Sequence, residues 1–170
     1  MVRIHVKHGE NFDREFLFDC PSISEIREIA ENVIQISNLQ LKIQRLVAEL
    51  EPRLSHLHGD SKAISLSRAL SEAKSYASKD QALHNRTLLP NLLKDHIQII
   101  ERELVLNYQL LGLSDSGQFQ VFVTGSEHLN EDTTQLCWAG KELMREKKLC
   151  DYIGRNEKTK ITIRLQSTVN

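Results

Sequence analysis

The stretch QLCWAGKELMREKKLCDYIGRNEKTKITIRLQ, residues 135–166, decides the fold of this chain. Its first apolar residues alternate up to the turn Ala139-Gly140-Lys141, and the alternation resumes at Leu143. The stretch closes with a run over residues 160–165 in which Ile, Ile and Leu share one face and Lys, Thr and Arg the other. Such alternation indicates half-buried strands. The pattern predicts two short strands joined by a glycine turn, a compact crossover around Leu149, and a final strand.

Residues 2–20 predict a β-hairpin, because two apolar–polar alternations flank a polar turn at residues 9–13. A proline then ends the second strand. Ser22 and Glu25 have the spacing of a capping box, which predicts that a helix begins at Ile23. Strand, strand and helix at one end of the chain thus precede three further strands at the other end.

The C-terminal stretch resembles ubiquitin, since the segments AGKEL, LCDY and KITIRL occur in the order of the second half of ubiquitin. We therefore expect an α+β fold, a ubiquitin-like β-grasp formed by residues 1–37 and 133–166. A large helical insertion, residues 38–117, is expected between the first helix and the third strand, within a single domain, residues 1–170. The final strand, residues 159–166, is expected to lie parallel to the first, because a long crossover joins them.

The insertion contains three helical patterns, over residues 39–54, 61–80 and 90–111. The first pattern also fits a strand at its start, because Leu39, Leu41 and Ile43 alternate, although the seam of leucines favours a helix. A break or bend is expected at Ser37-Asn38, and a kink or a stop at Pro52. Gly112 is expected to cap the third helix, and a further strand is expected over residues 118–123.

Bulk properties exclude several classes of function. The chain has 170 residues and a net charge of −1, so nucleic acid and membrane surfaces are not expected partners. Its three cysteines have neither metal nor redox spacing, which suits a reducing cytoplasm. We find neither a signal peptide nor an apolar run long enough to span a membrane, so a cytoplasmic location is expected.

Motifs for chemistry are scarce. The pair His56 and His58 lacks the further ligands that a metal site needs, and a solvated helix end is the favoured interpretation. Cys137 and Cys150 have no histidine close in sequence, and inert structural thiols are favoured over nucleophiles. No phosphate-binding loop or nucleophile elbow occurs. We therefore expect no enzyme activity, no catalytic residue, no cofactor and no metal.

Basic residues are concentrated in the last third of the chain. Residues 141–164 contain eight basic and four acidic side chains, whereas the rest of the chain is acidic. The basic residues, which are the candidate partner-docking residues, are Lys141, Arg145, Lys147, Lys148, Arg155, Lys158, Lys160 and Arg164. Such a face fits an acidic protein partner, although a solvated surface explains the same composition.

The chain also resembles the Kurly family of cilia- and flagella-associated proteins. The segments that carry this resemblance are MVRIHVKHG at the start and QLCWAGKEL and KKLCDYIGRNEKTKI near the end, with looser matches at LQLKIQRL and SEAKSYASKDQ. Members of this family are longer, with a larger insertion and a charged C-terminal extension. The chain is therefore expected to be a short, divergent member.

This resemblance implies a non-enzymatic adaptor or assembly factor for motile cilia and flagella that supports the assembly of axonemal dynein arms. The implied partners are dynein chains, dynein assembly factors or axonemal proteins. The implied location is the cytoplasm or the cilium itself, at the axoneme or basal body. The alternative is a ubiquitin-like interaction module in proteostasis. Conjugation is not expected of it, because no Gly-Gly pair follows the final strand.

Overall fold

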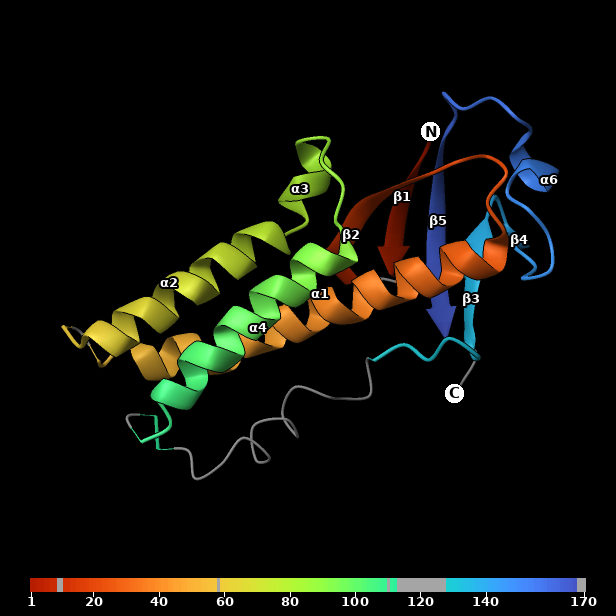
Figure 1. The fold of residues 1–170 in the computed structure, drawn as a ribbon. Helices are drawn as coiled ribbons and strands as arrows, with labels where there is room; N and C mark the ends of the chain where they lie inside the picture. The colour runs from red at the N-terminus through yellow and green to blue at the C-terminus, as the bar shows by residue number, and fades with distance from the viewer. Residues whose placement is uncertain (9–10, 58, 110, 113–127, 168–170) are drawn as a thin grey trace. The chain divides into compact units, whose positions relative to one another are not determined.

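The computed structural model describes residues 1–8, 11–57, 59–109, 111–112 and 128–167, apart from the side chains of residues 11–13. These residues fall into two compact units. The first comprises residues 1–38, 78–90 and 129–170, and the second comprises residues 39–77 and 91–128. The elements, labelled in Figure 1, are β1 (Val2–His8), β2 (Asn11–Cys20), α1 (Ile26–Leu54), α2 (Ser61–Tyr76), α3 (Asp80–Leu83), α4 (Pro90–Leu106), β3 (Thr134–Trp138), β4 (Lys141–Glu142), α6 (Cys150–Ile153) and β5 (Lys160–Ser167).

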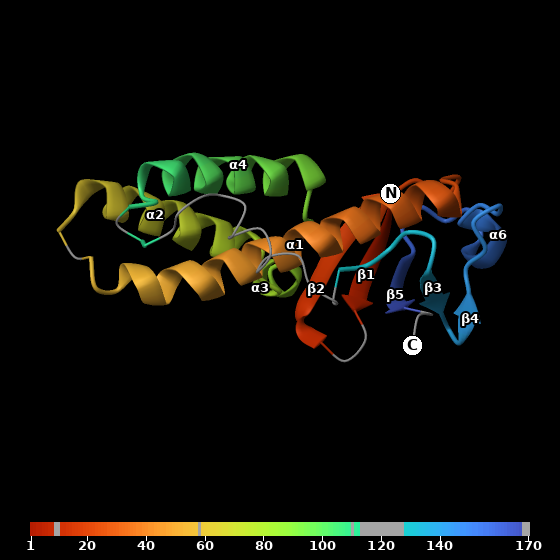
Figure 2. The ribbon, with the colours of Figure 1, turned by 90° about the horizontal axis from the view of Figure 1, so that it is seen from below.

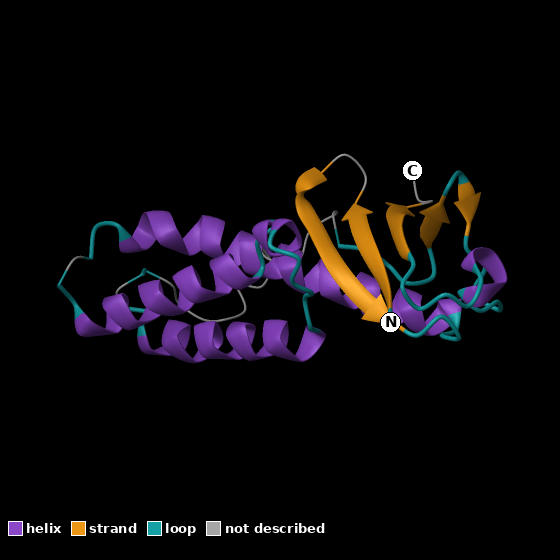
Figure 3. Ribbon diagram, turned by 90° about the horizontal axis from the view of Figure 1, so that it is seen from above, coloured by secondary structure: helices purple, strands orange, loops and turns teal. Residues whose placement is uncertain are grey.

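The first unit is built on a five-stranded mixed sheet in the order β2-β1-β5-β3-β4, drawn as orange arrows in Figure 3. The predicted N-terminal hairpin is confirmed, because β1 and β2 pair antiparallel with Ile4 opposite Phe18. The predicted parallel pairing of β1 with β5 is also confirmed, with Ile4 beside Ile161 and Val6 beside Ile163. All four of these aliphatic side chains are buried, so the two ends of the chain share one core.

The predicted α+β class is confirmed, and the sheet has two unlike faces. Figures 1 and 2 show the N-terminal half of α1 lying across one face, on which the apolar residues of the strands are buried. On β5 the exposed residues alternate with the buried ones from Lys160 to Gln166, and they point away from that helix. We call this second side of the sheet the open face. The assignment as a ubiquitin-like β-grasp within one domain stays a prediction.

Helix α1 begins at Ile26, three residues after the predicted start at Ile23. The expected capping box does not form, because Ser22 is occupied elsewhere: its amide and its hydroxyl both donate to Glu157, at 2.9 and 2.6 Å. The amide of Ile26 is instead satisfied by the carbonyl of Lys147, at 2.9 Å. A tertiary contact with the C-terminal stretch thus sets the start of the helix.

The predicted break at Ser37-Asn38 is wrong, because α1 runs without interruption from Ile26 to Leu54. Polar partners within the first unit bind both side chains. Arg14 donates to the hydroxyl and the carbonyl of Ser37, at 2.9 and 3.1 Å, and the Asn38 amide exchanges two hydrogen bonds with the backbone of Leu129. These side chains therefore do not compete with the helical backbone. Pro52, where a kink or a stop was expected, lies in the last turn of α1.

The second unit contains the C-terminal half of α1 together with α2 and α4, which run alongside one another in Figure 1. The helix expected over residues 39–54 is confirmed, since it forms part of α1 and the strand alternative does not occur. Asp60 caps α2 by accepting from the amides of Lys62 and Ala63, at 2.9 and 3.3 Å. The core of the unit is aliphatic and includes Leu50, Leu70 and Ile100, each fully buried.

Helix α4 ends at Leu106, so the predicted cap at Gly112 is wrong. Asn107 ends the helix, because its amide donates to the carbonyls of Glu103 and Lys62, at 2.7 and 3.2 Å. Residues 78–90, which were expected within the insertion, belong to the first unit. There the amide of Leu88 donates to the carbonyl of Leu17 in β2, at 3.2 Å. The strand expected over residues 118–123 lies outside the described residues.

Candidate functional site

Seven of the eight predicted docking residues are exposed, and the eighth, Arg145, is half-buried. The structure does not hold them as one patch. Lys160 and Arg164 lie on the open face of the sheet, in β5. Lys141 lies in the edge strand β4, opposite Trp138. The other predicted residues lie in the connections around α6, namely Arg145, Lys147, Lys148, Arg155 and Lys158.

The open face contains a further basic residue that the sequence analysis missed. Lys7 in β1 is paired in register with Arg164, and Arg3 is paired with Lys160. Because neighbouring residues in register point to the same side of a sheet, Lys7 joins the two cations of β5. We call Lys7, Lys160 and Arg164 the basic strip. Combining the alternation of the first strand with the predicted parallel pairing would have found Lys7.

The charges of the open face towards β2 are paired. Arg3 forms a two-pronged contact with Asp19, with both N–O distances at 2.9 Å, and also donates to Asn85. This contact lowers the pKa of Asp19, chiefly through the hydrogen bond from Arg3. His5 lies 2.8 Å from Glu15. Among the described residues the basic strip has no ion-pair partner, so its charges are available to a ligand.

In the connections around α6, unlike in the basic strip, charged side chains contact other groups of the protein. The ammonium of Lys147 lies 5.6 Å from the centroid of the Tyr152 ring, within range of a cation–π contact. Glu157, one of the acidic residues among the basic ones, accepts two hydrogen bonds from Ser22, which lower its pKa, and lies 3.8 Å from the N-terminal amine. This carboxylate therefore binds the N-terminal segment rather than the neighbouring lysines.

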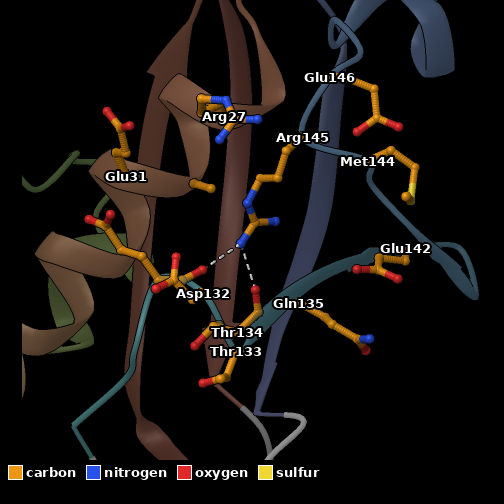
Figure 4. Close-up of a pocket in the computed structure, with 12 residues that line it drawn as sticks. Arg27, Glu31, Asp132, Thr133, Thr134, Gln135, Glu142, Met144, Arg145 and Glu146 are labelled. Atoms are coloured by element: carbon orange, nitrogen blue, oxygen red, sulfur yellow. Dashed lines mark hydrogen bonds between the residues drawn. The ribbon is translucent and has the colours of Figure 1, made fainter.

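Arg145 is part of a pocket instead of the open face. Its guanidinium donates to the carbonyls of Thr134 and Glu131, at 2.6 and 3.2 Å (Figure 4). The pocket has a volume of about 320 Å³ and lies between the first turns of α1, the start of β3 and the segment after β4. Arg145 therefore holds the entry to β3, which removes it from the residues that present a free charge to a partner.

Two cysteines have thiols of low reactivity. Burial raises the pKa of Cys20 to about 11, and burial followed by the charge of Glu142 raises the pKa of Cys137. Because the thiolate is the nucleophile, both thiols are poorly reactive near neutral pH. Within the described residues no group of His, Cys, Asp or Glu could hold a metal ion. His58, of the predicted histidine pair, lies outside the described residues.

Trp138 and its neighbours lie as the alternation predicts. Leu136 is fully buried, and Trp138 is largely buried on the same side of β3. Cys137 points to the open face, where it is paired in register with Arg164 and its thiol lies 3.6 Å from the side chain of Gln166.

None of the described helices is both long enough and apolar enough to cross a membrane.

Comparison with known proteins adds an independent finding. Residues 134–170 match the sequence model of the family described as Cilia- and flagella-associated protein 298. The chain is 28% identical to the Cilia- and flagella-associated protein 298-B of Xenopus laevis, over 98% of this chain and 75% of the relative. The resemblance to the Kurly family is thereby confirmed. The matched model covers β3 to β5, the stretch that carries all of the predicted docking residues.

The likeness to the Kurly family extends across wide evolutionary distances. The human Cilia- and flagella-associated protein 298 is 27% identical over 98% of this chain and 76% of its own length, and the Drosophila melanogaster protein is 25% identical over 97% and 76%. The alignment with the human protein spans 224 positions, more than the 170 residues of this chain, so the relative contains inserted residues. No solved structure matches the chain.

Proposed function

We propose that this protein is a non-enzymatic adaptor or assembly factor of motile cilia or flagella, which supports the assembly of axonemal dynein arms by docking to other proteins. The likeness to relatives named for their association with cilia and flagella supports the cellular setting. The observation that carries the docking mechanism is the basic strip, three cations without ion-pair partners among the described residues, on the side of β1 and β5 that points away from α1.

The chemistry of the strip supports an acidic partner. Lys160 and Arg164 stand on one side of β5, separated by the exposed hydroxyl of Thr162. An extended acidic segment lying along β5 would meet a cation, a hydroxyl and a second cation in turn, with Lys7 beside the last. Charges on such a face steer association and select partners more than they add affinity. The partners are dynein chains, dynein assembly factors or axonemal proteins that carry an acidic tail or loop.

The test is rescue of ciliary motility by charge-reversed variants in a ciliated cell that lacks the protein. One variant reverses the basic strip, Lys7→Glu, Lys160→Glu and Arg164→Glu. A second reverses the connections around α6, Lys147→Glu, Lys148→Glu and Lys158→Glu. A control reverses two exposed lysines of the second unit, Lys62→Glu and Lys94→Glu. Each protein is expressed with a tag and checked for its thermal midpoint.

We expect the strip variant to fold normally, to lose its co-purifying dynein-related proteins at moderate salt and to leave dynein arms short or missing in electron micrographs. The control should restore motility. Full rescue by the strip variant would refute docking through the open face, and rescue lost only in the second variant would place docking around α6. Recovery of ubiquitin receptors or proteasome subunits, without dynein-related proteins, would favour the alternative role in proteostasis.

A further inference from the structure

The pocket beside Arg145 is lined by more acidic than basic side chains. Five carboxylates line it, together with the guanidiniums of Arg27 and Arg145, so negative charge is in excess by three. Figure 4 shows the lining drawn from both walls, with Glu31 on α1 and Glu142 and Glu146 on the opposite side. The carboxylates are those of Glu31, Glu131, Asp132, Glu142 and Glu146. This excess opposes the basic strip in sign, although both belong to the same unit.

The carboxylates of the pocket are not neutralised by ion pairs among the described residues. None of the five forms an ion pair with any residue that the structure describes. Arg145 does not neutralise them by direct contact, because it donates to the backbone carbonyls of Glu131 and Thr134. All five carboxylate residues are exposed, so their charges are open to a cation that enters the pocket.

A second observation at the same place is independent of charge. Thr134 lines the pocket and is only 3% exposed. Its side chain lies on the side of β3 that faces α1, the helix that supplies other lining residues. Its hydroxyl has no hydrogen-bond partner among the described residues. Buried hydroxyls nearly always have a partner, so an orphan one at the wall of a pocket points to a ligand that supplies it.

The volume of the pocket and the chemistry of its lining indicate which class of ligand it can bind. The volume of about 320 Å³ lies at the small end of the range for ligand pockets, which fits a single side chain better than a cofactor. The His, Cys, Asp and Glu side chains of the described residues are not arranged to hold a metal ion. A guanidinium offers five donors in a plane and pairs with more than one carboxylate. It can also donate to the hydroxyl of Thr134.

We propose that this pocket binds an arginine side chain from a basic segment of a partner protein. The site differs from the basic strip in place, in sign and in ligand, so it goes beyond the proposed function and does not depend on it. The protein would then present two docking surfaces of opposite charge on one unit. Arg145 would hold the start of β3 in place, while the arginine of the partner would form ion pairs with the carboxylates.

The experiment measures peptide binding to the full chain by isothermal titration calorimetry and by chemical shifts in NMR. The probe is a short glycine peptide with one central arginine and blocked ends. The matched ligand replaces that arginine with citrulline, which keeps the shape and removes the charge. A lysine version of the peptide tests whether the planar guanidinium matters or only its charge.

Three variants locate the site. Glu31→Gln with Glu142→Gln removes two charges from exposed positions on opposite walls, and the fold should be unaffected. Thr134→Val keeps the shape of the side chain and removes its hydroxyl. The matched control is Glu28→Gln, which removes an equally exposed carboxylate one turn earlier on α1, outside the pocket lining. Thermal midpoints of all three are measured first.

We expect the arginine peptide to shift resonances of the pocket residues, and the citrulline peptide to bind about tenfold more weakly or not at all, as the loss of a charge-assisted hydrogen bond implies. The double variant should weaken arginine binding by at least about tenfold, and Thr134→Val by about threefold, with Glu28→Gln unchanged. Equal binding of the two peptides, or an equal loss in the Glu28→Gln control, would overturn the proposal.

Discussion

The two faces of the sheet in the first unit differ although the same strands build both. On the face covered by α1, Ile161, Ile163 and Leu165 are buried against the aliphatic residues of β1. On the open face, the residues between them are exposed. Adjacent positions in one strand therefore have different roles. The buried apolar side chains stabilise the fold, whereas the exposed charges add little to stability and are available for binding.

The open face itself divides into paired and available charges. Towards β2, Arg3 and His5 are each held by a carboxylate of the neighbouring strand. Towards β5 the cations have no ion-pair partner among the described residues. Cross-strand pairing thus decides which charges stabilise the hairpin and which belong to the proposed docking surface. The following changes test this division, beginning with the largest effect expected on stability.

Replacing two consecutive residues of β5 should separate the two faces most sharply. Ile163→Ala removes a fully buried side chain and should lower the free energy of unfolding by about 2–5 kcal/mol, because it leaves a cavity in the shared core. Arg164→Ala should change it by no more than about 0.5 kcal/mol. Urea unfolding followed by circular dichroism gives both values. Similar losses in the two variants would mean that the open face is packed against another part of the protein.

The same contrast applies at β3, with a smaller difference. Trp138→Ala should destabilise the fold by about 3 kcal/mol, at the lower end for a tryptophan because the ring is largely but not fully buried. Its neighbour Cys137 points to the open face, and Cys137→Ala should have an effect below about 1 kcal/mol. Thermal midpoints compare the two. An unchanged midpoint for Trp138→Ala would show that this ring is a surface residue and a candidate binding anchor.

The Arg3–Asp19 pair should give a pH-dependent contribution to stability. The pKa of Asp19 is lowered from its ordinary value of 3.8, so the contribution is present above pH of about 4 and is lost as the pH falls through the folded-state pKa. Asp19→Asn should lower stability by about 1 kcal/mol at neutral pH, since both side chains are partly exposed. The difference from wild type should shrink in urea titrations at pH near 2. A constant difference would exclude the pair as its source.

The smallest effect on stability is expected at Lys7, where binding should respond instead. Lys7→Glu should change the free energy of unfolding by no more than about 0.5 kcal/mol. Binding of a short polyglutamate peptide, measured by fluorescence anisotropy, should weaken by about fivefold and should also weaken as salt is raised. Lys62→Glu in the second unit is the control. An equal loss of peptide affinity in both variants would mean that binding depends on net charge and not on the basic strip.

Much of the architecture follows from periodicity. The alternation over residues 2–20 and 160–165 predicted the hairpin and the parallel closing strand, because a strand half-buried in a sheet needs apolar side chains at every second position. The errors lie at the ends and junctions of helices. Ser22, Ser37 and Asn107 were misinterpreted or overlooked. Ser22 and Ser37 make their hydrogen bonds with residues far away in the sequence, and Asn107 bonds both to nearby Glu103 and to distant Lys62.

The candidate site was predicted in composition and not in grouping. The basic residues of the last third are evident in the sequence, and their composition predicted a single face. Arg145 lines a pocket with acidic neighbours from α1 and from the segment before β3, and Lys7 comes from the opposite end of the chain. No local pattern connects residues so far apart, because pairing between strands and packing of a helix on a sheet bring them together.

The sequence by itself determined which positions in each strand are apolar, where charge accumulates, and that the chain resembles a family of ciliary proteins. These properties depend on composition and short-range spacing, which are local. Only the tertiary structure decided which of the charges are paired, since an ion pair requires two side chains within about 4 Å whatever their separation along the chain. The tertiary structure also decided that the hydroxyl of Thr134 is buried without a hydrogen-bond partner among the described residues, because both properties depend on the residues packed around it.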